Sequence, residues 1–107
     1  MIALRFFFDS GSGTCLWAAN PAAHAAHGYA VDHHALPLSP TLRARLTRLI
    51  ARHDTRLDWS NPGGPSPWSA ADEAAFTAES AATLAALRAE LAAHHIEILD
   101  GPAHSAS

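Results

Sequence analysis

Apolar and polar side chains alternate at the start of the chain. Large apolar residues occupy the even positions from Ile2 to Phe8. A period of two with aromatic and branched residues predicts a β-strand. Residues 9–13 contain two glycines, and residues 14–19 form a second apolar run. Because a five-residue connection with glycine is typical of a β-hairpin, the chain is expected to begin with one.

Two longer segments carry apolar residues at helical spacing. Ser39 and Pro40 form a helix start, and leucines then recur at three- and four-residue steps over residues 40–53. Ser69, with Asp72 three residues later, begins a longer segment in a capping-box arrangement. The sequence therefore predicts two amphipathic helices. The prolines and glycines of residues 54–67 predict a loop between them. The buried stripe predicted for the second helix is Phe76, Leu84, Leu87 and Leu91.

Shorter patterns lie on either side of these helices. Residues 21–27 predict a short helix that Gly28 ends, and residues 29–38 predict an irregular crossing segment. Residues 95–99 predict a third strand, with Ile96 and Ile98 facing inward. The small residues that follow predict a frayed tail over residues 102–107.

This order of elements predicts an α+β fold of the ββααβ kind. A right-handed crossover through the helix pair places the last strand parallel to the first. The result is a small mixed sheet of order 2-1-3, covered on one face by both helices. A length of 107 residues fits a single domain over residues 1–107.

Composition narrows the setting in which the protein works. The formal net charge is −3, which does not favour nucleic acid as a partner. Cys15 is the only cysteine, so no internal disulfide forms, and a reducing, cytoplasmic location is expected. No apolar run approaches the length of a membrane-spanning helix, so no membrane association is expected.

Histidines are the candidate ligands for a metal. His24, His27, His33 and His34 lie close together in sequence, with Asp32 as a further oxygen ligand. Several imidazoles together can bind zinc. Neither paired cysteine ligands nor a His-Glu-x-x-His segment accompanies them. We therefore expect no metal and no cofactor, and a ligand or metal site at these histidines is the alternative.

A loop flanked by two tryptophans is the most unusual feature of the sequence. Tryptophan is common at interface hot spots, although large aromatic residues also carry much of the burial in a small domain. Three arginines share one face of the preceding helix and form either a docking surface for an acidic protein or a solvated face. The predicted partner-binding residues are Trp59, Trp68, Asn61, Arg45, Arg48 and Arg52.

Several short segments carry a family resemblance. They are Cys15-Leu16-Trp17, Gly28-Tyr29-Ala30-Val31, Leu36-Pro37-Leu38-Ser39, His53-Asp54-Thr55 with Leu57-Asp58-Trp59, and Pro65-Ser66-Pro67-Trp68. Over nearly the whole chain, these segments resemble a group of small actinobacterial proteins of similar length with no assigned activity. The resemblance implies a stand-alone cytosolic protein and assigns no site residues.

Together these features favour a small, non-enzymatic protein-binding module. An immunity or antitoxin-like role, in which the protein masks a toxin, is the concrete version of this hypothesis. A small enzyme or a ligand-binding domain that uses the histidines is the alternative. RNA binding along the arginines is disfavoured, because the net charge is negative and no aromatic platform for stacking accompanies them. The predicted open strand edges are compatible with a homodimer.

Overall fold

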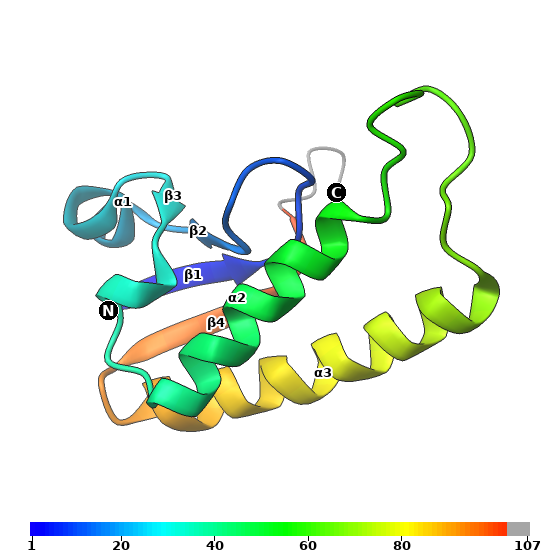
Figure 1. Cartoon of the computed structure of the whole chain (residues 1–107). Coiled ribbons are helices and arrows are strands. Elements are labelled where there is room, and N and C mark those ends of the chain that lie inside the picture. Colours follow the sequence, from blue (N-terminus) through cyan, green and yellow to red (C-terminus); the bar gives the residue numbers. More distant parts are fainter. Residues whose placement is uncertain (103–107) are drawn as a thin grey trace.

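The computed structural model describes residues 1–102 and shows a small sheet with two long helices packed on it (Figure 1). The strands are β1 (Ile2–Phe6), β2 (Leu16–Ala18), β3 (Ala30–Val31) and β4 (Ile96–Asp100). The helices are α1 (Pro21–His27), α2 (Pro40–Asp54) and α3 (Ala70–Ala92), with a short 3-10 helix, η1 (His33–Ala35), before α2. Apart from Pro102, the predicted frayed tail lies outside the described residues.

The sheet is mixed and has the order β3-β2-β1-β4. β1 pairs antiparallel with β2 and parallel with β4, where Leu4 faces Ile98. The predicted α+β class, the mixed sheet and the parallel crossover are therefore confirmed. The short helix predicted over residues 21–27 is confirmed as α1. The predicted ββααβ arrangement with order 2-1-3 is wrong in detail, because it leaves that helix out of the main element order and lacks a fourth strand that pairs with β2. That strand has only two residues, too few to show a period of two.

Side chains decide where the hairpin strands end. The paired residues of β1 and β2 end at Phe6 and Leu16, and the Phe7 amide makes one further backbone hydrogen bond, to the Cys15 carbonyl at 3.1 Å. The Phe7 carbonyl accepts a hydrogen bond from Trp17 Nε1 at 3.0 Å. On the other strand, the Thr14 hydroxyl donates to the Val31 carbonyl at 2.6 Å and accepts from the Leu16 amide at 3.2 Å. The predicted strands, residues 2–8 and 14–19, are therefore longer than the observed ones.

The helix starts are those that the sequence predicts. Ser39 caps α2, where its hydroxyl accepts from the Leu42 amide at 3.2 Å. Glu90 of α3 binds the same residue, accepting from the Ser39 amide at 2.6 Å and from its hydroxyl at 2.8 Å. This contact links the start of α2 to the end of α3. Ser69 and Asp72 form the predicted capping box of α3.

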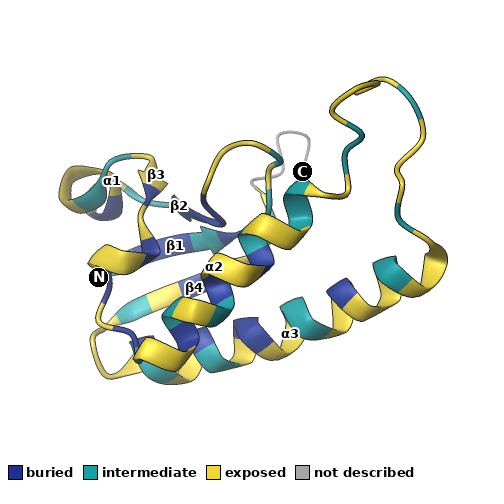
Figure 2. Ribbon diagram, in the orientation of Figure 1, coloured by how far each residue is buried: buried dark blue, intermediate teal, exposed yellow. Residues whose placement is uncertain are grey.

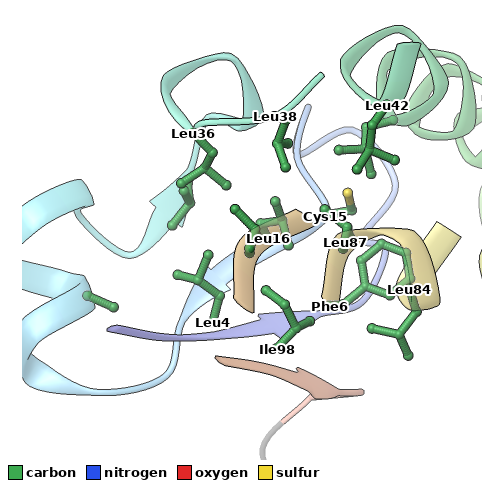
Figure 3. Close-up of a cluster of buried hydrophobic side chains, with 14 residues drawn as sticks. Leu4, Phe6, Cys15, Leu16, Leu36, Leu38, Leu42, Leu84, Leu87 and Ile98 are labelled. Atoms are coloured by element: carbon green, nitrogen blue, oxygen red, sulfur yellow. The ribbon is translucent and has the colours of Figure 1, made fainter. Parts of the chain in front are cut away.

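The core lies between the sheet and one side of the helix pair, as Figure 2 shows by the dark stripes on α2 and α3. Figure 3 shows leucines of both helices meeting the inward side chains of the strands. Leu4, Leu46 and Leu87 are fully buried. This arrangement confirms that both helices cover one face of the sheet. Other members of the core are Phe6, Leu16, Leu36, Leu42, Leu84, Leu91 and Ile98.

The edge strand β4 carries a side-chain contact on its backbone. The Arg88 guanidinium donates two hydrogen bonds, both of 3.1 Å, to the Ile98 carbonyl. A strand added at this edge would compete with Arg88 for that carbonyl. The predicted homodimer stays a prediction. Within residues 1–102, no helix has the length and apolar character needed to cross a membrane.

Candidate functional site

The segment between α2 and α3 projects from the end of the helix pair (Figure 1). We call residues 55–69 the tryptophan loop. Its prolines and glycines prevent a regular ladder, and short turns organise it instead. The Asn61 amide donates to the Asp58 carbonyl at 3.0 Å, and the Gly64 amide donates to the Asn61 carbonyl at 2.9 Å. The Ser66 hydroxyl donates to the Arg56 carbonyl and joins the two ends of the loop.

The two tryptophans of this loop have different surroundings. Trp68 packs on Phe76, with ring centroids 5.2 Å apart, and its Nε1 donates to the Thr55 hydroxyl at 2.9 Å. Trp59 is 57% exposed, although its Nε1 donates to the Asp54 carbonyl at 2.9 Å. Trp68 therefore anchors the loop, and Trp59 presents an aromatic surface to solvent.

The hairpin turn between β1 and β2 supports Trp59. The Cη2 edge of the Trp59 ring lies against Gly11, since a Cβ placed on Gly11 would be 3.1 Å from Trp59 Cη2. The Gly11 amide donates to Asp54 Oδ1 at 2.9 Å, and the Ser10 hydroxyl lies 3.3 Å from His53 Nδ1. These contacts join two segments that are 43 residues apart in sequence. We call residues 9–13 and 52–73 together the loop end.

A histidine lies beneath this surface. His53 stacks on Phe8, with ring centroids 5.3 Å apart, and tilts against Phe76 at 5.5 Å. Burial lowers the pKa of His53, and the nearby positive charge of Arg56 acts in the same direction. Burial therefore favours the neutral imidazole, and His53 fills space between the hairpin and the helices.

Two of the four arginines of α2, Arg48 and Arg52, form ion pairs with α3. Arg48 lies 3.3 Å from Glu79, and Arg56 of the loop lies 2.7 Å from Glu73. Arg52 lies 4.0 Å from Asp72 and places its guanidinium carbon 5.5 Å from the centroid of the Trp68 ring. Arg45 has no ion pair within residues 1–102. Exposed pairs of this kind contribute about 0–1 kcal/mol each. The role predicted for the arginine face in partner binding stays a prediction.

Negative charge concentrates at the loop end. This region carries five carboxylates and two arginines, a local excess of three negative charges. Asp58 lies beside Trp59 in sequence and accepts two hydrogen bonds from Ser60, which lower its pKa. The excess equals the formal net charge of the whole chain, which is −3. The five carboxylates are those of Asp9, Asp54, Asp58, Asp72 and Glu73.

Three of the residues proposed as metal ligands lie together. Ligand atoms of Asp32, His33 and His34 lie within 4.8 Å of one another. His33 is buried, and its Nε2 lies 2.8 Å from the Thr47 hydroxyl. That hydroxyl donates its proton to the Arg43 carbonyl, so it accepts from His33 Nε2–H and leaves Nδ1 as the only ligand atom of the ring. Within residues 1–102, no such group of three includes His24 or His27.

An apolar groove with a volume of about 420 Å³ lies between α3 and the ends of β1 and β4. Phe8 and Phe76, which also contact His53, form part of its wall. The Ser80 hydroxyl oxygen beside it is buried and has no hydrogen-bond partner within residues 1–102. The groove therefore lies behind the aromatic cluster that supports the tryptophan loop.

The fold is that of a small α+β protein. Its exposed tryptophan, Trp59 on the tryptophan loop, is a surface feature of the kind that proteins use to bind one another. The sequence model of a family described as Serratia CdiI immunity protein-like matches residues 4–98. Since the match covers most of the chain, the protein belongs to this immunity protein-like family. The family implies a protein partner, a toxin. No curated relative matches the sequence. The actinobacterial part of the resemblance stays a prediction.

The structure separates the six predicted site residues. Trp59 and Asn61 are exposed on the tryptophan loop, whereas Trp68 is half-buried under Arg52. Sequence reasoning missed the carboxylates around Trp59. Two of them, Asp54 and Asp58, precede the tryptophan by five positions and by one position, and this spacing was a usable signal. Asp9 belongs to a distant turn, and only folding brings it to the same end.

Proposed function

We propose that this chain is an immunity protein that neutralises a toxin by binding it and catalyses no reaction of its own. Membership of the immunity protein-like family supports this role. The observation that carries the choice of surface is Trp59, a large aromatic side chain that is 57% exposed on a projecting loop. Exposed tryptophans are among the residues that contribute most when an interface forms.

The tryptophan loop provides the contact surface in this proposal. Trp59 and Asn61 meet the toxin directly, and Trp68 holds the loop in place from beneath. Arg45, Arg48 and Arg52 lie on α2, the helix that leads into this loop, and extend the proposed contact surface. Arg48 and Arg52 pair with acids of α3, so their contribution to binding is secondary to that of Trp59.

The expected location of this activity is the cytosol. A secreted domain of this size ordinarily carries disulfides. The single cysteine of this chain, Cys15, is buried.

The proposal is tested by neutralisation rather than by binding alone. A protein captured from the host with this chain as bait is expressed alone and together with the chain. Growth arrest by the captured protein, relieved by co-expression of this chain, is the expected result. A captured protein that is harmless, or whose toxicity this chain does not relieve, contradicts the proposed function.

Two aromatic substitutions locate the surface. Trp59→Ala is expected to weaken toxin binding about 30-fold, the effect of a hot-spot residue worth about 2 kcal/mol. Tyr29→Ala is the matched control, since Tyr29 is also 57% exposed but lies between α1 and β3. Both variants must keep the circular dichroism spectrum of the parent chain. A larger loss of affinity in Tyr29→Ala would move the interface away from the tryptophan loop.

A further inference from the structure

The charge of this protein is unevenly distributed. The loop end carries five carboxylates and two arginines, and the rest of the chain carries five carboxylates and five arginines. The whole formal charge of −3 therefore belongs to the loop end, and the remainder is formally neutral. A fixed charge gathered at one end produces a local field that attracts a partner of opposite sign.

The acids nearest to Trp59 keep their charge available. Asp58 uses one carboxylate oxygen to accept from the Ser60 amide at 3.0 Å and from its hydroxyl at 2.6 Å. Within residues 1–102, the Asp9 carboxylate has no ion pair. By contrast, Asp72 and Glu73 face Arg52 and Arg56 at the start of α3. The loop-end carboxylates without an ion pair within residues 1–102 are therefore those of Asp9, Asp54 and Asp58, in the hairpin turn and in the segment that leads to Trp59.

The exposed indole suits a cation as well as an apolar group. The face of a tryptophan ring is electronegative and attracts a guanidinium or an ammonium group. The same loop already contains one such contact, since the Arg52 guanidinium carbon lies 5.5 Å from the centroid of the Trp68 ring. The Trp59 ring is exposed, the acidic residue Asp58 directly precedes it in sequence, and no arginine covers it within residues 1–102.

We infer that the toxin surface covering Trp59 is basic, with an arginine or lysine side chain stacked on the indole and bonded to Asp9 or Asp58. This inference rests on the proposed function and names the chemistry of the partner at that site. An acidic partner surface meets three excess negative charges here and is repelled. A purely apolar partner surface would bury those carboxylates without compensation.

The first experiment uses the full chain and a defined probe. An arginine hexapeptide and a glutamate hexapeptide are titrated into ¹⁵N-labelled protein, and the indole Nε1–H resonance of Trp59 is followed. Trp59→Phe assigns that resonance. The arginine peptide is expected to shift it, while the glutamate peptide and the resonance of the buried Trp17 show no change. A Trp59 resonance that does not respond to the arginine peptide overturns the inference.

Paired charge variants separate a local effect from a general one. Asp9→Asn with Asp58→Asn removes two charges beside Trp59 and keeps the Asp58 oxygen that accepts from Ser60. Glu97→Gln with Asp100→Asn removes two charges from exposed residues of β4. The first pair is expected to weaken peptide binding about threefold to tenfold, and the second pair to leave it unchanged. Equal losses in both pairs overturn the inference.

The toxin identified by neutralisation provides an independent readout. Its association rate is expected to fall steeply between low and high salt, and the Asp9→Asn, Asp58→Asn pair is expected to flatten that dependence. A toxin that is neutralised, but whose association rate depends neither on salt nor on these two carboxylates, overturns the basic surface and leaves the proposed function intact. Failure of neutralisation removes the proposed function itself.

Discussion

The contact between Trp59 and the hairpin turn can be tested with two glycine substitutions. Gly11 and Gly13 both have positive φ angles, 83° and 76°. An alanine in either position suffers the left-handed backbone strain of an L-residue, about 1–2 kcal/mol. A Cβ on Gly11 would lie 3.1 Å from Trp59 Cη2, whereas a Cβ on Gly13 would meet nothing within 4 Å. The two variants therefore share the backbone strain and differ in the contact with Trp59.

The additional effect of Gly11→Ala follows from that contact. Ordinary van der Waals contact begins near 3.4 Å, so the Trp59 ring must move by a few tenths of an ångström. Its hydrogen bond to the Asp54 carbonyl opposes this movement. Overpacking of this kind costs about 1 kcal/mol where one neighbour can move toward solvent. Gly11→Ala is therefore expected to lower the melting temperature about 4–8 °C further than Gly13→Ala.

Thermal unfolding followed by circular dichroism measures the two melting temperatures, and the Trp59 indole resonance reports the position of the ring. The resonance is expected to shift in Gly11→Ala and to stay in place in Gly13→Ala. Equal melting temperatures together with an unmoved Trp59 resonance in both variants would refute the contact between Trp59 and Gly11.

Four further predictions concern the core, the link between the helices, and the titrating groups. Leu87→Ala should lower the free energy of unfolding by about 2–5 kcal/mol in urea titrations, because Leu87 is fully buried, and a change below about 1 kcal/mol would contradict its place in the core. Ser39→Ala and Glu90→Ala should be non-additive in a double-mutant cycle, with a coupling of about 1–2 kcal/mol, since Glu90 binds both the amide and the hydroxyl of Ser39; simple additivity argues against that link. Burial raises the pKa of the Cys15 thiol to about 12. A thiol reagent at pH 8 should therefore modify Cys15 only as fast as the chain unfolds, and immediate modification of the folded chain would contradict this burial. Burial lowers the pKa of His53 from its ordinary value of 6.5, so below pH 6.5 the unfolded chain binds more protons than the folded chain, and the free energy of unfolding declines as the pH falls. His53→Phe should flatten this decline, and an unchanged slope would exclude His53 as its source.

Local features of the fold were predictable because each depends on neighbouring residues. The N-caps at Ser39 and Ser69 and the stop at Gly28 involve groups within four residues of one another. The parallel pairing of the last strand with the first was predicted as a crossover connection through the helix pair, and the observed pairing confirms it. The strand β3 was not predictable, because its two residues pair with β2 only after α1 has turned the chain back.

The candidate site shows the same division between local and distant information. The sequence singled out Trp59 and Trp68 together, since both flank the same proline-rich loop. It did not distinguish them, because exposure depends on what packs against each ring. Trp68 meets Phe76 from the first turns of α3, whereas Trp59 contacts Gly11 of the hairpin turn and the Asp54 carbonyl and stays 57% exposed.

The sequence by itself determined the α+β class, the two long helices with their caps, the initial hairpin and a net charge of −3. These properties depend on local patterns or on simple sums. Only the tertiary structure decided that Trp59 faces solvent, that Arg48 and Arg52 of α2 pair with acids of α3, and that the excess negative charge lies at the loop end, which also carries this exposed indole. The physical reason is distance along the chain: the contacts that set this surface join residues as far as 43 positions apart, and they form only when the hairpin packs against the end of α2.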